Sequence, residues 1–275
     1  MKFKKQEIAL MILLGLVIVV SVVVLFLIFR EYSEGDRKYH EMTEYVFLPE
    51  EETAVPTRPG IAAEDGSAPG SLEPTAPTPE LSQGGTVVDT GAPIVDFAGL
   101  QQQNPDIIGW IYSAGTEINY PIVQGKDNEE YLYRMADGTN NRCGSIFLDY
   151  QNDREFQDAN SVINGHHMKN GSMFSSLLGY VEQEYYNEHP RIWLVTPDKT
   201  YSLELFAGIV TDSESDVWKL SFTTEEDFAA WKSEMVRHSY FKSTVIPRAE
   251  EKVVTLSTCT YDFEGARFVV MGVLR

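Results

Sequence analysis

The longest hydrophobic run in the chain lies at its N-terminus, from Ile8 to Phe29. It contains no charged residue, and only Gly15 and Ser21 interrupt its apolar side chains. A helix of this length, at about 1.5 Å per residue, extends about 33 Å and reaches across the hydrocarbon core of a bilayer. The pattern therefore predicts a membrane-spanning helix at residues 8–29.

A cleaved signal peptide is the competing interpretation of this run. Signal peptides usually have an apolar stretch of about 7–15 residues followed by a cleavage site of small residues. Here Phe29 runs directly into Arg30 without an Ala-x-Ala pattern, which favours an uncleaved single-pass anchor in the cell membrane. Three lysines precede the run. The positive-inside bias then places residues 1–7 in the cytoplasm and everything after Arg30 outside the cell.

The apolar pattern is lost between residues 30 and 92. The part from about 50 to 92 is rich in Pro, Ala, Thr, Ser, Gly and Glu. Such a composition buries too little apolar surface to offset the entropy of folding. We therefore predict an extracellular stalk at 30–92, mostly disordered, that holds the rest of the chain away from the membrane. Within it, residues 31–48 can continue the membrane helix for a few turns.

From residue 93 onward, short apolar and β-branched runs alternate with clusters of Gly, Asn, Asp and Pro. Such punctuation is typical of short strands joined by turns. Eight strands over about 180 residues indicate a mainly β domain at 93–275, either a closed barrel or a sandwich. The predicted strands are Ile107–Tyr112, Ile118–Val123, Ser145–Leu148, Ser161–Asn164, Ile192–Val195, Tyr201–Val210, Val253–Thr258 and Phe268–Leu274.

Two helices are predicted within this domain. The first covers Phe97–Gln103, with Asp96 as its N-cap. The second begins at the capping box Thr223–Glu226 and presents a one-sided apolar stripe. We expect this stripe to pack on the strands rather than to bind a cofactor. Its residues are Phe228, Trp231 and Met235.

The chain is acidic, with a formal net charge of −19. It has no long cluster of Lys and Arg, so nucleic acid is not an expected partner. An acidic surface favours solubility outside the cell but identifies no ligand.

Three side chains of the predicted domain carry candidate chemistry: Cys259, His166 and Arg267. Cys259 follows the strand Val253–Thr258, and Arg267 begins the last strand eight residues later, so that a hairpin would place both beside one loop. His166 lies at the exit of another apolar strand. Each residue also has an ordinary interpretation, as a buried thiol, a surface histidine and an exposed arginine.

Taken together, these three groups suit acyl transfer through a thioester. Nearby cations lower the pKa of a thiol, a histidine can donate a proton to a leaving amine, and an arginine can bind a developing oxyanion. This chemistry needs Cys259 as a free thiol, so we expect no disulfide with Cys143, the other cysteine. We expect no metal, because the other histidines form no ligand motif with His166 and His167.

The sequence resembles the sortase family of cysteine transpeptidases. Residues 255–259 read Thr-Leu-Ser-Thr-Cys, which matches the family signature Thr-Leu-x-Thr-Cys. Arg267 and the pair Gly165-His166 complete the catalytic set of the family. Four further segments look like class B sortases in particular. These are residues 104–111, 118–124, 144–149 and 164–174.

The resemblance implies an eight-stranded sortase β-barrel that needs no cofactor. It implies an enzyme of Gram-positive cell surfaces that cleaves a sorting motif near the C-terminus of surface proteins and transfers them to an amine of the cell-wall precursor. Cys259 would be the nucleophile, His166 the general acid/base, and Arg267 the stabiliser of oxyanion and substrate. The family histidine directly follows the glycine, which favours His166 over His167. Substrate-binding candidates are Ser257, Thr258, Trp218 and Phe222, the last two with core packing as their alternative.

Two other functions stay open at this point. A sortase can polymerise pilin subunits by using a lysine amine, and a barrel of this kind can serve as a membrane-tethered binding module without turnover. The sequence also departs from class B in its long linker and in Thr260, where an acidic residue often follows the cysteine. Asp262 and Glu264 are nearby candidates for a carboxylate that orients His166.

Overall fold

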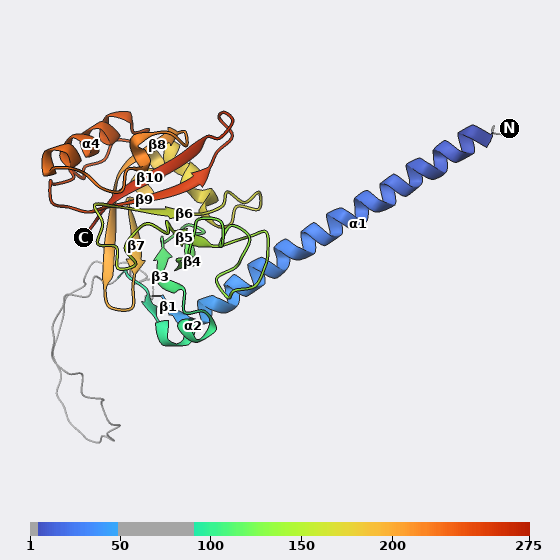
Figure 1. Ribbon diagram of the computed structural model, residues 1–275, viewed down its shortest axis with the longest axis horizontal. Helices are drawn as coiled ribbons and strands as arrows, with labels where there is room; N and C mark the ends of the chain where they lie inside the picture. The colour runs from blue at the N-terminus through green and yellow to red at the C-terminus, as the bar shows by residue number, and fades with distance from the viewer. Residues whose placement is uncertain (1–4, 49–90) are drawn as a thin grey trace, which may run out of the picture.

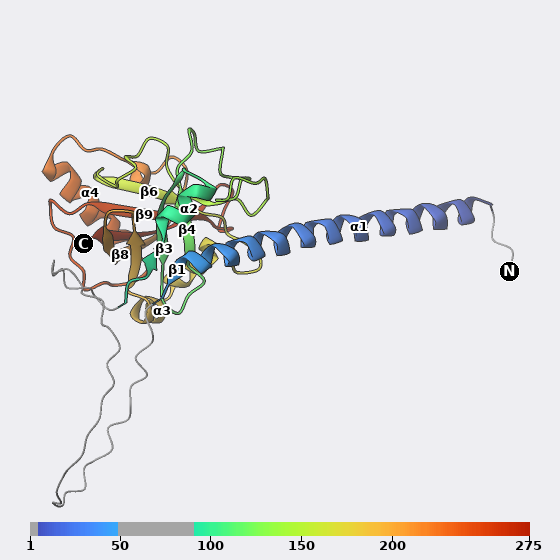
Figure 2. The same cartoon turned by 90° about the horizontal axis from the view of Figure 1, so that it is seen from below.

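The computed structural model of the protein describes residues 5–48 and 91–275. One long helix, α1 (Lys5–Met42), leads from the N-terminal side into a β-rich domain (Figure 1). The C-terminal end of α1 lies next to β1 (Val46–Phe47), as Figure 1 and Figure 2 both show. Helix α2 (Phe97–Gln103) packs against Tyr45, which lies between α1 and β1.

Helix α1 is long and apolar enough to cross a membrane, and none of its apolar window is buried within the protein. It does not end at Phe29, where the apolar run ends, but continues to Met42. In this last part Tyr39 and Met42 are only 6% and 2% exposed. The helix therefore has an exposed apolar part and a C-terminal part that packs on the domain.

Of the predicted stalk at 30–92, the structure describes the first part, and there the helix continues for some turns. Residues 30–48 are helical up to Met42, pass through the short helix η1 (Thr43–Tyr45) and enter β1. Strand β1 pairs with β2 (Ile94–Val95). Because β1 and β2 are paired neighbours, the number of residues between them does not set the distance between α1 and the domain. The disorder predicted for 50–92 falls outside the described residues, except at its last two positions.

In the described part of the chain, eight strands form a closed barrel in the order β10-β8-β7-β3-β4-β5-β6-β9. The barrel confirms the eight predicted strands, each to within one residue at either end, and decides against a sandwich. Neighbouring strands are antiparallel except for the pairs β4–β5 and β6–β9, which are parallel. The strands are β3 (Ile107–Tyr112), β4 (Asn119–Val123), β5 (Ile146–Leu148), β6 (Asn160–Asn164), β7 (Arg191–Val195), β8 (Thr200–Thr211), β9 (Val253–Cys259) and β10 (Arg267–Leu274).

Both predicted helices of the domain are present. Asp96 caps α2 by accepting a hydrogen bond from the backbone N–H of Gly99. Helix α4 (Glu225–His238) begins one residue later than the predicted capping box, because Thr224 rather than Thr223 accepts the N–H of Asp227. Its apolar stripe is buried with side chains of β8, β9 and β10, as expected. Three short helices have no counterpart among the predictions: η2 (Phe174–Val181), α3 (Gln183–Glu188) and η3 (Asp216–Trp218).

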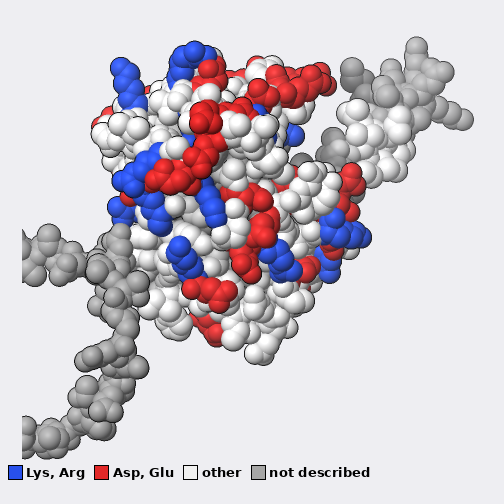
Figure 3. All heavy atoms as spheres, turned by 60° about the vertical axis from the view of Figure 1, so that its left-hand side comes forward, with Lys and Arg blue, Asp and Glu red and all other residues white. Residues whose placement is uncertain are grey.

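Charged side chains of both signs are interspersed on the face of the domain shown in Figure 3. Lys and Arg lie next to Asp and Glu there, so this face is neither uniformly acidic nor uniformly basic. Neighbouring opposite charges reduce the long-range potential of such a face.

A buried lysine on α4 holds the segment that follows the helix. Lys232 is 2% exposed, and its Nζ donates hydrogen bonds to the carbonyls of Arg248, Ala249 and Glu251. We expect Lys232→Met to lower the free energy of unfolding by about 1–3 kcal/mol, because these carbonyls lose a charged donor. Denaturant unfolding of the full chain in detergent measures this loss. The matched variant of an exposed lysine, Lys242→Met, should stay close to wild type, and an equal loss in both variants would contradict the prediction.

Candidate active site

The hairpin of β9 and β10 places Cys259 beside Arg267. In the antiparallel register of the two strands Cys259 lies directly opposite Arg267, as the sequence predicts. Side chains of such a cross-strand pair lie on the same face of the sheet. The pair stands at the end of the barrel where the hairpin loop connects the strands, and both side chains are partly exposed.

Strand β6 brings His166 to the same end of the barrel. It pairs with β9 in parallel, with Asn164 opposite Ser257, and the N–H of Gly165 donates to the carbonyl of Ser257 at 2.9 Å. Parallel neighbours finish at the same edge, so His166 leaves β6 where Cys259 leaves β9. Gly165 is required here because a Cβ at this position would lie 2.5 Å from the ring of Phe174.

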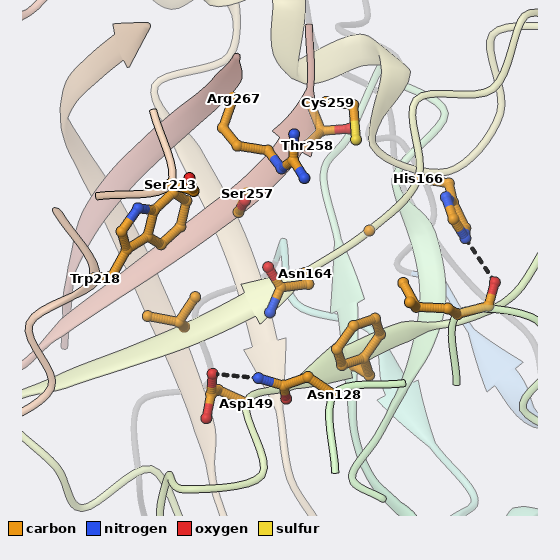
Figure 4. A pocket seen from close by; sticks show the side chains of 14 residues that line it. Asn128, Asp149, Asn164, His166, Ser213, Trp218, Ser257, Thr258, Cys259 and Arg267 are labelled. Carbon is orange, nitrogen blue, oxygen red and sulfur yellow. Dashed lines mark hydrogen bonds between the residues drawn. The ribbon is translucent and has the colours of Figure 1, made fainter. Parts of the chain in front are cut away.

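Cys259, His166 and Arg267 line one cavity (Figure 4). In this view the sulfur of Cys259 lies between the guanidinium of Arg267 and the ring of His166. The structure therefore brings together the three residues that the sequence singled out.

Three of the four predicted substrate-binding residues line the same cavity: Ser257, Thr258 and Trp218. Phe222 does not. Its ring packs 4.6 Å from the ring of Phe228 and 5.1 Å from that of Trp231, both on α4. In this structure Phe222 therefore packs against the apolar stripe of α4 and does not line the cavity.

Apart from Gly165, the sequence singles out none of the other residues that line the cavity. Some of these, such as Asn164, fall in the segments that resemble class B sortases, but Asn128 and Leu132 lie in a long loop without hydrophobic periodicity. The side chain of Asn128 donates to the carboxylate of Asp149 at 2.7 Å (Figure 4). The additional lining residues are Asn128, Leu132, Phe147, Asp149, Val162, Asn164, Gly165 and Ser213.

The two adjacent histidines have different partners. His166 Nε2 lies 2.7 Å from the carbonyl oxygen of Leu132. Because a carbonyl can only accept, Nε2 carries the hydrogen, and Nδ1 is the basic nitrogen of neutral His166. His167 Nδ1 lies 3.1 Å from the carbonyl of Cys259 and so ties β9 to the segment after β6. His167 thus supports the backbone, whereas His166 faces the cavity.

A backbone carbonyl, not a carboxylate, orients His166. Asp262 and Glu264 are exposed in the hairpin loop, and the Asp262 carboxylate accepts the hydroxyl of Thr260. A loop that turns away from the barrel keeps these carboxylates hydrated, since hydration is more favourable for an ion than burial.

Arg267 is anchored to the same loop. Its Nη1 donates to the carbonyls of Gly265 and Ala266, at 3.2 and 3.1 Å. The planar guanidinium is thereby fixed at one nitrogen while it projects toward the cavity (Figure 4). The remaining donors of the guanidinium suit a developing oxyanion.

Both cysteines are free thiols, but only Cys259 is placed for reaction. Cys143 is buried, and burial together with Asp36 and Glu31 raises the pKa of its thiol to about 12. In the described part of the chain, no group of three or more His, Cys, Asp or Glu side chains is arranged to hold a metal ion.

Comparison with known proteins matches this chain and its fold to one family. The profile of the sortase domain matches residues 111–275. Sortase B of Listeria monocytogenes is 37% identical over 181 residues, which cover 65% of this chain and 74% of that protein. Sortase B of Staphylococcus aureus is 33% identical over 178 residues, which cover 64% and 73%.

Solved structures give the same result. The crystal structure of Staphylococcus aureus sortase B is similar with a TM-score of 0.62 and 32% identity, covering 65% of this chain and 86% of that one. A substrate complex of that protein and a sortase B complexed with triglycine match with the same TM-score and identity, covering 65% of this chain and 84% and 85% of theirs. The chain thus belongs to the sortase family of cysteine transpeptidases, and its structural neighbours are class B sortases.

Proposed function

We propose that the protein is a membrane-anchored sortase that joins surface proteins to an amine of the cell-wall precursor. The observation that carries the proposal is the single cavity in which Cys259, Arg267 and His166 meet. Helix α1 would hold the enzyme in the membrane of a Gram-positive cell, with the N-terminus in the cytoplasm and the barrel outside.

In the first half of the reaction the Cys259 thiolate attacks the carbonyl carbon of the scissile bond in the sorting motif. The carbonyl oxygen becomes an oxyanion beside the Arg267 guanidinium. When the C–N bond breaks, the leaving amine takes a proton from His166. Because Nε2 already donates to Leu132, the proton comes from Nδ1 of the imidazolium form. The product is a thioester on Cys259.

In the second half an amine attacks the thioester carbonyl and gives its proton to Nδ1 of His166. Collapse of the intermediate releases the thiolate and forms a new amide bond, so protons and charge balance over one cycle. The complexes of related sortase B proteins with a substrate and with triglycine support a peptide donor and an amine acceptor for this chain.

The sorting motif would lie along Ser257, Thr258 and Trp218. Within the described structure, the buried hydroxyl of Thr258 has no hydrogen-bond partner. A buried hydroxyl without a partner is costly, and a polar group of the bound peptide would satisfy it.

A peptide-library assay tests the proposal directly. The full chain in detergent micelles is incubated with peptides of varied sorting motif and an oligoglycine amine, and the products are identified by mass spectrometry. We expect an acyl group on Cys259 and a new amide with the amine. If the protein forms no acyl-enzyme with any peptide, this function is refuted, and the alternative of a non-catalytic binding module is favoured. With a pilin-type protein as donor, a ladder of linked subunits would identify the polymerising alternative.

Arg267→Lys should lower kcat by about 10²–10³-fold with little change in KM, because a lysine cannot hold the loop carbonyls and the oxyanion at once. Steady-state kinetics with the best library peptide measures this loss. The matched control is Arg237→Lys on the exposed face of α4, which should keep wild-type kinetics. A kcat for Arg267→Lys within about twofold of wild type would show that the guanidinium does not contact the oxyanion.

A further inference from the structure

The last turns of α1 pack on the wall of the cavity that holds His166. We call residues 31–42 the juxtamembrane segment and residues 124–145 the β4–β5 loop. Lys38 forms an ion pair with Asp137 at 2.7 Å, and the backbone carbonyl of Glu31 accepts from Asn141 at 3.0 Å. A helix that continues from the apolar part of α1 therefore touches the loop at several points along its length.

Tyr39 makes the deepest of these contacts. Its side chain is buried, and its hydroxyl donates to the carbonyl of Gly144 at 2.5 Å. The same oxygen lies 3.2 Å from the hydroxyl of Ser145 and accepts the N–H of Ala136 at 3.4 Å. The hydroxyl of Tyr39 therefore connects Ala136 with Gly144 and Ser145, at the end of the β4–β5 loop.

Gly144 in turn contacts the catalytic histidine. Its backbone has φ +57°, and a Cβ here would lie 2.4 Å from the carbonyl oxygen of Leu132 and 2.9 Å from the ring of His166. The Leu132 carbonyl is the group that accepts Nε2–H of His166. The peptide that Tyr39 holds therefore packs against both the ring and its acceptor.

Gly35 and Cys143 set how closely the juxtamembrane segment approaches the loop. A Cβ on Gly35 would lie 2.5 Å from Sγ of Cys143. The helix backbone therefore rests directly on the thiol, next to the residue that Tyr39 holds. This contact gives Cys143, which the catalytic chemistry does not use, a packing role.

We propose that Tyr39 is a positioning residue for His166. Through Gly144 it holds the β4–β5 loop so that the Leu132 carbonyl keeps His166 in the Nε2–H form, with Nδ1 toward the reacting groups. The juxtamembrane segment is then a support of the active site as well as a connection to the membrane. The inference rests on the proposed function, in which His166 moves the proton.

Tyr39→Phe tests the proposal, with Tyr180→Phe as the matched control. Tyr180 is also fully buried, and its hydroxyl donates to the carbonyl of His189 at 2.8 Å, away from the cavity. Each variant of the full chain loses one buried hydroxyl and one hydrogen bond to a carbonyl. We expect Tyr39→Phe to lower kcat by about 5–20-fold with KM within about twofold of wild type, while Tyr180→Phe keeps the wild-type kcat.

The imidazole signals of histidine labelled with ¹⁵N give a readout that does not depend on turnover. Wild type should show His166 as the Nε2–H tautomer with a slowly exchanging proton. Tyr39→Phe should speed exchange of this proton by about fivefold or more, and Tyr180→Phe should not. An unchanged His166 signal in Tyr39→Phe overturns the proposal whatever the turnover. A changed signal in a protein whose wild type forms no acyl-enzyme keeps the positioning role and refutes the proposed reaction.

A second pair of variants keeps the test decisive if Tyr39→Phe does not fold. Gly35→Ala favours the helix but pushes it from Cys143, so it should lower kcat and speed exchange of the His166 proton. Adding Cys143→Ala removes the sulfur that the new methyl group meets and should restore most of both values. Equal values for Gly35→Ala and wild type would show that the position of the helix does not reach His166.

Discussion

We expect Cys259→Ala to abolish acyl transfer while the barrel stays folded. The thiol is the nucleophile of the proposed reaction, and a methyl group cannot form the thioester, so turnover should fall by at least about 10⁴-fold, to the background of the assay. The residue lies at the end of β9 and is partly exposed, so the loss of its sulfur removes little buried contact. The melting temperature should stay within about 2 °C of wild type.

The matched control for this variant is Cys143→Ala. It removes the other thiol of the chain, which is buried. The Cys143→Ala protein should still form the acyl-enzyme and still react with a thiol-directed substrate mimic, whereas Cys259→Ala should do neither. Mass spectrometry of the intact protein after incubation with a sorting peptide distinguishes the two. An acyl group that persists on the Cys259→Ala protein would exclude the thioester mechanism.

The strands of the barrel could be predicted from the sequence because each one is a short apolar run between turn residues. The hairpin of Cys259 and Arg267 followed from the same pattern, since the two runs are close in sequence and their register is set by a short loop. The meeting of His166 with Cys259 depends on the parallel pairing of β6 and β9, which are far apart in the chain. Periodicity does not reveal such a pairing, and only the family resemblance predicted it.

Other parts of the site could not be predicted from the hydrophobic pattern of the sequence, for physical reasons. The juxtamembrane segment is polar overall and buries only a few side chains such as Tyr39. Its sequence pattern therefore does not indicate that it packs on the domain. The orienting partner of His166 is a backbone carbonyl, which carries no sequence signal, whereas the sequence offers only the carboxylates of Asp262 and Glu264 as candidates. Phe222 carries the same apolar signal whether it lines a cavity or packs on α4, and only the structure distinguishes the two.

Gly144→Ala should lower both the stability of the fold and the activity of the enzyme. A left-handed backbone costs a residue with a Cβ about 1–2 kcal/mol, so the variant should be less stable by that amount. The new methyl group would also meet the Leu132 carbonyl and the ring of His166, and one of these must move. Displacement of the proton-transfer group by even about 1 Å should lower kcat by about 10²-fold.

Gly171→Ala separates the two causes of this loss. Gly171 has φ +89°, but a Cβ there would have no heavy atom within 4 Å, so its substitution carries the backbone strain without the contact with His166. We expect Gly171→Ala to lose similar stability in denaturant unfolding yet keep kcat within about threefold of wild type. If both variants lost turnover equally, backbone strain alone would account for the effect. If only Gly144→Ala does, the contact between Gly144 and His166 is what the reaction requires.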